Sequence, residues 1–131
     1  MPRRKSASTF DTVRAIAKAL PDVEEGTAYG TPAIKLRGHL LACIASHKSA
    51  EPNTLVIRVS FDQRDAMIAD DPDTYYLKDH YVGYPCVLVR LARIHPDALR
   101  DLLHAGWRFV DERTPTRARR RAARPRKPAR R

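Results

Sequence analysis

The chain has 131 residues, enough for one ordinary domain with a single hydrophobic core but not for two. With 43% hydrophobic and 31% charged residues it has the composition of a folded globular protein, and its longest apolar run, residues 40–45, is far too short to span a bilayer. The net charge of +10 is concentrated at the ends: residues 113–131 hold nine arginines, one lysine and no acid, whereas residues 6–112 hold twelve basic and fifteen acidic residues.

The N-terminal half predicts one helix followed by three strands. Ser8-Thr9-Phe10-Asp11 has the pattern of a capping box, and apolar residues follow it at helical spacing as far as Pro21. Beyond the turn residues Gly26 and Gly30, alternation of apolar and polar side chains predicts three strands, at residues 32–37, 39–46 and 54–60.

The C-terminal half predicts a short helix, two strands and a long helix. Ser60-Phe61-Asp62-Gln63 opens the short helix, which the acidic residues near Pro72 close. The strands are expected at residues 74–78 and 86–92, joined by an aromatic loop. Pro96 begins the last helix, whose apolar positions run to Val110, although Gly106 allows an interruption.

This order of elements predicts an α+β fold, because hairpin-connected strands form an antiparallel sheet that amphipathic helices cover. We expect a two-layer sandwich with about five strands packed against the N- and C-terminal helices. The expected organisation is a basic disordered N-terminus at residues 1–7, a folded domain at 8–112 and a disordered arginine-rich tail at 113–131, since the tail has no apolar periodicity to bury.

Several blocks of the sequence resemble the MmcQ/YjbR family of small bacterial proteins: Leu20-Pro21-Asp22-Val23-Glu24-Glu25-Gly26-Thr27, His80-Tyr81-x-Gly83-Tyr84-Pro85 and Ala105-Gly106-Trp107-Arg108. The resemblance runs from about residue 10 to about residue 110. It implies a sheet-and-helix domain related to type III secretion chaperones and to the CyaY-like shape, and a protein labelled DNA-binding. It implies no catalytic residues. After Arg108 the chain departs from the family's ending, so the resemblance does not explain the tail.

The tail is the strongest functional feature of the sequence. Guanidinium groups suit bidentate contact with phosphates, so a run of them predicts DNA binding without sequence preference. The residues expected to make these contacts are Arg117, Arg119, Arg120, Arg121, Arg124, Arg126, Lys127, Arg130 and Arg131. The alternative is that the tail only aids solubility, while the domain holds a partner protein as a chaperone does.

A second candidate site is the aromatic loop at residues 79–85 with the tyrosines before it. Side chains of this kind stack on exposed bases or cover a small-molecule pocket, and Tyr76, His80, Tyr81 and Tyr84 are the residues that would form such a pocket here. More often such residues pack over the edge of a core, and this structural role is the favoured interpretation.

The sequence predicts no catalytic site, metal site or cofactor. The five histidines lack metal-ligand spacing, Asp70, Asp71 and Asp73 lack the rest of a calcium loop, and the scattered glycines form no phosphate-binding loop. Cys43 and Cys86 lie in apolar surroundings, where buried, reduced thiols are expected. The N-terminus shows no apolar run typical of a signal peptide, so a cytoplasmic location is expected.

Overall fold

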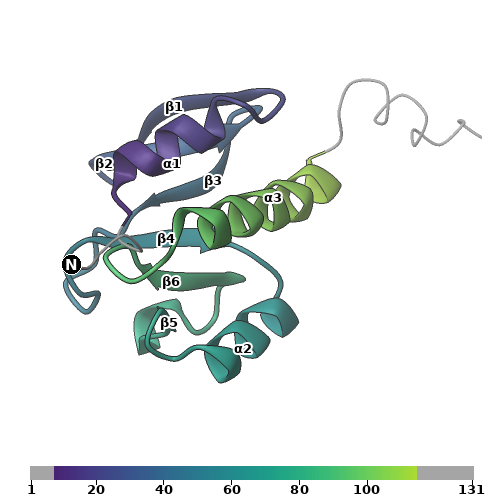
Figure 1. The fold of residues 1–131 in the computed structure, drawn as a ribbon. Helices are drawn as coiled ribbons and strands as arrows, with labels where there is room; N and C mark the ends of the chain where they lie inside the picture. Colours follow the sequence, from purple (N-terminus) through teal and green to yellow (C-terminus); the bar gives the residue numbers. More distant parts are fainter. Residues whose placement is uncertain (1–7, 115–131) are drawn as a thin grey trace, which may run out of the picture.

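A computed structural model describes residues 8–114 (Figure 1). The predicted N-terminal segment 1–7 and residues 115–131 of the predicted tail lie outside this part of the chain. Six strands form one sheet in the order β1-β2-β3-β4-β6-β5, and all neighbours are antiparallel. The elements, in chain order, are α1 (Phe10–Ala17), β1 (Val23–Ala28), β2 (Thr31–Leu36), β3 (His39–Ile44), β4 (Thr54–Arg58), α2 (Phe61–Asp70), β5 (Tyr75–Tyr76), the 3₁₀ helix η1 (Asp79–Tyr81), β6 (Cys86–Arg90) and α3 (Pro96–Arg113).

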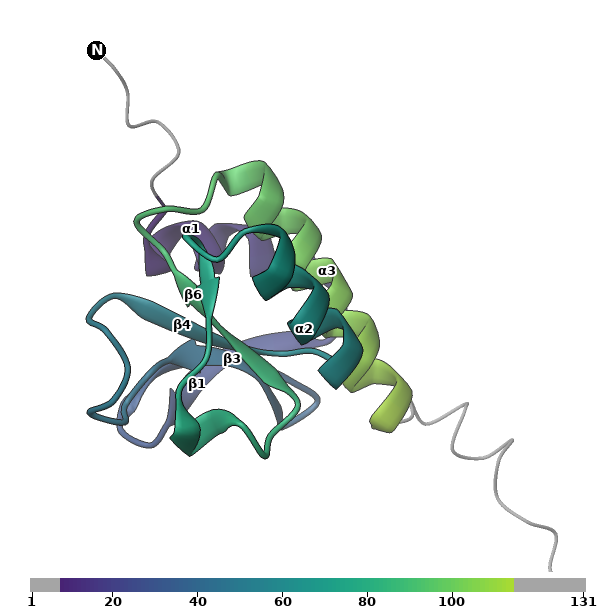
Figure 2. The same ribbon diagram turned by 90° about the horizontal axis from the view of Figure 1, so that it is seen from below.

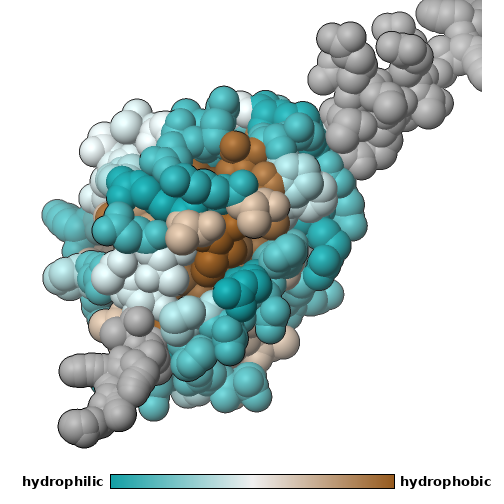
Figure 3. Space-filling view, turned by 45° about the horizontal axis from the view of Figure 1, so that its top comes forward, coloured by the Kyte–Doolittle hydropathy of each residue, from teal (hydrophilic) through white to brown (hydrophobic). Residues whose placement is uncertain are grey.

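The fold is the predicted α+β arrangement, with the helices on one side of the sheet. Figure 2 shows the α-helices along one side of the strands, with η1 and the loops near it on the other. The main core lies between the sheet and α1 and α3, where Ile34, Leu36, Ile57 and Leu103 are fully buried. The face drawn in Figure 3 is mostly hydrophilic, with an elongated hydrophobic strip near its centre and a smaller hydrophobic area toward its left edge.

The helices begin within one residue of where the sequence predicts. The capping box predicted for α1 at Ser8 and Asp11 is shifted by one residue: Thr9 is the cap and makes a reciprocal pair of contacts with Thr12, while the Ser8 hydroxyl donates a hydrogen bond to the carbonyl of Ile94. Ser60 caps α2 with Gln63 as predicted. Both caps satisfy backbone N–H groups that have no partner inside the helix. Pro96 occupies the first turn of α3, where its missing N–H costs nothing. No helix within residues 8–114 is long and apolar enough to cross a membrane.

Besides the strand predicted at residues 74–78, which is reduced to Tyr75–Tyr76, two details differ from the prediction. The sheet has a further strand, β1, in a segment where Glu24, Glu25 and Gly26 hide the alternation typical of strands. Pairing with β2 along the whole of β1 stabilises it in spite of that composition. The second difference is that α3 runs through Gly106 without a break.

The sheet face opposite α1 and α3 carries a smaller cluster of buried residues: Ala33, Cys43, Val56, Tyr76, Tyr81, Cys86 and Leu88. An irregularity in β3 shapes this face. Between the pairs Ile34–Ala42 and Lys35–Leu40 the register shifts, so that Leu41 has no partner on β2. Side chains three positions apart in a strand normally point to opposite sides of the sheet. Because of the extra residue, Leu40 and Cys43 lie on the same side.

Candidate functional site

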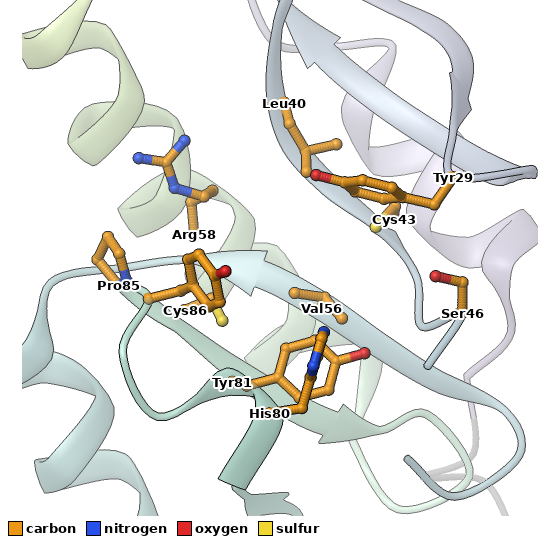
Figure 4. Close-up of a pocket in the computed structure, with 11 residues that line it drawn as sticks. Tyr29, Leu40, Cys43, Ser46, Val56, Arg58, His80, Tyr81, Pro85 and Cys86 are labelled. Carbon is orange, nitrogen blue, oxygen red and sulfur yellow. The ribbon is translucent and has the colours of Figure 1, made fainter. Parts of the chain in front are cut away.

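A cavity of about 570 Å³ lies on the sheet face that α1 and α3 do not cover. Its size falls in the range typical of small-molecule sites, roughly 300–1,000 Å³. The residues around it come from three strands, two turns and the aromatic loop: Tyr29, Leu40, Cys43, Ser46, Val56, Arg58, His80, Tyr81, Tyr84, Pro85 and Cys86. Figure 4 shows Tyr29 on one side and His80 with Tyr81 on the other, with Val56 between them.

The floor of the cavity is apolar and uncharged. Cys43, Val56 and Cys86 project from β3, β4 and β6, and each is buried. Burial raises the pKa of the Cys43 thiol and raises the pKa of the Cys86 thiol to about 11. Both thiols are therefore protonated near neutral pH, which makes them poor nucleophiles and places no negative charge on the floor.

The aromatic loop forms one wall. The rings of His80 and Tyr81 meet edge to face with their centroids 4.8 Å apart, and the His80 ring stacks on that of His47 at 3.7 Å. Arg64 of α2 holds the loop in place, since its guanidinium donates a 2.9 Å hydrogen bond to the carbonyl of Val82. This wall is therefore fixed by an arginine that is itself largely buried.

Tyr29 forms the opposite wall from a tight turn. Tyr29 and Gly30 are the two turn residues between Ala28 and Thr31, which pair as the last and first residues of β1 and β2. Their φ angles are 53° and 80°, as in a type I′ turn, whose first position favours asparagine, aspartate or glycine. The turn therefore holds a large aromatic side chain, 79% exposed, in a backbone conformation that tyrosine rarely adopts.

Arg58 is the one cation among the residues that line the cavity. It ends β4, where it pairs with Cys86, and its guanidinium lies 5.3 Å from the centre of the Phe109 ring. The guanidinium of Arg113 lies over the same ring at 3.7 Å. Burial lowers the pKa of Arg58, and the nearby charge of Arg113 lowers it further.

The sequence model of the YjbR family matches residues 18–109, most of the chain. The chain belongs to the YjbR family. The resemblance drawn from the sequence is thereby confirmed. Among curated proteins, uncharacterized proteins of Mycobacterium bovis and Mycobacterium tuberculosis are each 48% identical over 42 residues, or 32% of this chain. The chain matches about a third of the length of these relatives.

A solved structure supports the fold of this YjbR family member. The crystal structure of Deinococcus radiodurans protein DR2400, described as a DUF419 domain, has a TM-score of 0.71 to this structure. The similarity covers 92% of this chain and 91% of that one, with 19% of residues identical. At that identity the likeness shows the fold alone.

The structure brings together three of the four residues predicted to form a pocket. His80, Tyr81 and Tyr84 line the cavity, whereas Tyr76 is buried beside it. The hydroxyl of Tyr76 instead lies 2.6 Å from the Thr54 hydroxyl and accepts a 2.8 Å hydrogen bond from a backbone N–H, which is a structural role. The nine predicted DNA contacts, Arg117 to Arg131, lie outside the described residues.

Sequence reasoning missed Tyr29, Arg58 and the two cysteines as members of the site. The glycine directly after Tyr29 indicates a tight turn, and this pattern could have placed Tyr29 at the tip of a hairpin. Arg58 and Cys86 are 28 positions apart in the sequence, and only the pairing of β4 with β6 makes them neighbours. Within residues 8–114 no three His, Cys, Asp or Glu side chains converge as metal ligands.

Proposed function

We propose that this YjbR family member binds DNA without sequence preference, through phosphate contacts of its basic C-terminal segment. The observation that carries the proposal is the separation of charge along the chain. Ten basic residues and no acid occupy residues 113–131, whereas residues 6–112 carry a slight acidic excess. Neutralising phosphates releases condensed counterions, and the free energy gained in this way is independent of base sequence.

The ion pairs of the folded part support placing DNA contact in that segment. Most arginines of the described chain face a carboxylate nearby, for example Arg14 with Asp11 at 2.6 Å and Arg90 with Glu51 at 2.8 Å. Such cations are already compensated and offer little to a phosphate. Arg113, the first residue of the basic segment, ends α3, so the segment begins at the end of a rigid element.

A salt titration of duplex binding tests this proposal. The test variant keeps the length of the chain and replaces the nine cations from Arg117 to Arg131 by glutamine. For the wild type, log K should fall with log salt at about −0.9 for each phosphate neutralised, equally for two unrelated duplexes. The variant should lose most of the affinity and most of the slope.

A matched control removes charge from the folded part instead. Lys18, Lys48 and Lys78 are exposed, and their replacement by glutamine should change the slope only slightly. If the tail variant bound with unchanged affinity and slope, the proposal would be wrong.

A protein-interaction role is the second candidate, and one observation favours it. β1 is an edge strand whose central residues are exposed, so its free backbone groups can pair with a strand of another chain. Co-purification separates the two roles: nucleic acid that nuclease removes supports the first, and a stoichiometric protein supports the second. We propose a binding role rather than catalysis in both cases. The two thiols beside the cavity are poor candidates for a nucleophile, since burial raises the pKa of each.

A further inference from the structure

The cavity contains one cation and no compensating anion. None of the described residues that line it is an aspartate or a glutamate. Arg58 has no hydrogen-bond acceptor or ion-pair partner within residues 8–114. Two other arginines that are more than half buried do have such partners: Arg37 contacts Asp22 at 2.8 Å, and Arg90 contacts Glu51. Arg58 is therefore a partly buried cation at the wall of the cavity that has the Phe109 ring beside it but no anionic partner among the described residues.

The cavity is also flanked by aromatic rings that the fold does not need. Tyr29 and Tyr84 are among the most exposed large side chains of the described chain, at 79% and 59%. Neither is required to close the core. Tyr29 moreover sits at a positive φ that an asparagine would adopt more easily. Residues held in rarely populated backbone conformations occur often at binding sites.

These features together define the chemistry of an occupant. A flat apolar body would lie between Tyr29 and the His80–Tyr81 wall, over the floor of Val56 and the two protonated thiols. A negative group on that body would meet the guanidinium of Arg58, which is a planar fork of N–H donors. In Figure 4 this guanidinium points away from Tyr29 and His80, so the Arg58 side chain would turn toward the cavity to make the contact. We propose that the cavity binds a small organic anion with a flat apolar body and a single anionic group, which Arg58 holds. The residues of this site are different from the nine cations at residues 117–131 that we propose contact DNA.

Fluorescence titration of the full-length protein with two dyes tests the proposal. 1-Anilinonaphthalene-8-sulfonate has a flat apolar body and one sulfonate, and N-phenyl-1-naphthylamine has the same ring system without the charge. Arg58→Gln should weaken binding of the sulfonate about tenfold, as expected for a lost charge-assisted hydrogen bond, and leave the neutral dye within about twofold. Arg100→Gln removes the same charge from an exposed pair with Asp97 and should change neither constant.

Tyr29→Asn provides a second test that misfolding cannot mimic. Asparagine suits the turn, so the melting temperature should stay the same or rise, while both dyes should bind several-fold more weakly because one wall is gone. The proposal is overturned if the sulfonate dye does not bind the wild type. It is equally overturned if both variants bind that dye as the wild type does, or if Arg58→Gln weakens the two dyes equally. Neutralising the basic segment should leave the effect of Arg58→Gln intact, which separates this site from the DNA proposal.

Discussion

The two faces of the sheet differ in what they bury. The face under α1 and α3 carries large aliphatic side chains that are completely enclosed, such as Ile57 and Leu103. The opposite face carries small side chains and thiols under a partial cover of aromatic loops, and leaves a cavity. Because strand residues alternate between faces, each central strand contributes to both. One layer of strands therefore supplies stability on one side and a shaped surface on the other.

The sharpest way to test this comparison uses two neighbours in β4. Ile57 points to the helices and is fully buried, whereas Val56 lies on the floor of the cavity. Ile57→Ala should lower the free energy of unfolding by about 2–5 kcal/mol, since it leaves a void that packed neighbours cannot fill. Val56→Ala should cost about 1–2 kcal/mol, because fewer methyl groups are lost and the site already adjoins open space. Denaturant unfolding measures both.

The same pair of variants should separate stability from binding. Dye binding in the cavity should change with Val56→Ala and remain as in the wild type for Ile57→Ala, measured under conditions where both variants are folded. Equal losses of stability would contradict the proposed division between the two faces.

A smaller effect is expected where α3 touches the sheet. A Cβ on Gly106 would lie 3.0 Å from the Arg58 carbonyl oxygen and 3.1 Å from two side-chain carbons of Ile57. Overpacking of this kind costs about 1–3 kcal/mol, which outweighs the ~1 kcal/mol that alanine gains over glycine in a helix. Gly106→Ala should therefore lower the free energy of unfolding by up to about 2 kcal/mol.

Gly83 provides the matched control, because a Cβ there would meet nothing within 4 Å. Gly83→Ala should change stability by less than about 0.5 kcal/mol, as is usual at an open surface position. A Gly106→Ala variant more stable than the wild type would show that α3 can move away from β4 at little cost.

The contact at Gly106 also shows what the sequence could and could not predict. The apolar periodicity of α1 and α3 predicts both helices, because it is a local pattern. In the sequence Gly106 suggests a break in the last helix, because the β4 residues that leave no room for a side chain there lie far away in the sequence. β1 was missed for a related reason: its acids are poor strand formers, and its stability comes from pairing with β2.

The residues of the candidate site also fall into two groups, those that the sequence predicts and those that only the fold brings together. His80, Tyr81 and Tyr84 stand close together in the sequence, and a local cluster of aromatic residues predicted them. Tyr29 and Arg58 reach the cavity only through the sheet, and the shift in register within β3 that places Leu40 beside Cys43 has no sequence signature. Local chemistry is readable from the sequence, whereas the meeting of distant strands is not.

The smallest predicted effect concerns pH and lies at the edge of the open face. Glu51 accepts two 2.8 Å hydrogen bonds from the guanidinium of Arg90, which also lies over the ring of Tyr76. These hydrogen bonds, and then nearby positive charges, lower the pKa of Glu51 below its ordinary value of 4.5. A carboxylate with a lowered pKa in the folded state contributes stability above the unfolded pKa and loses it as the pH falls through the folded one.

The stability difference between wild type and Glu51→Gln should therefore be constant above about pH 6 and shrink below about pH 4.5. Its size should stay under about 1 kcal/mol, because the pair is partly exposed and screened by solvent. Thermal or urea unfolding across this pH range measures it. In an Arg90→Gln background the same exchange should produce almost no pH-dependent difference, since the guanidinium that lowers the pKa is gone. A difference that persisted unchanged in that background would assign the pH dependence to another carboxylate.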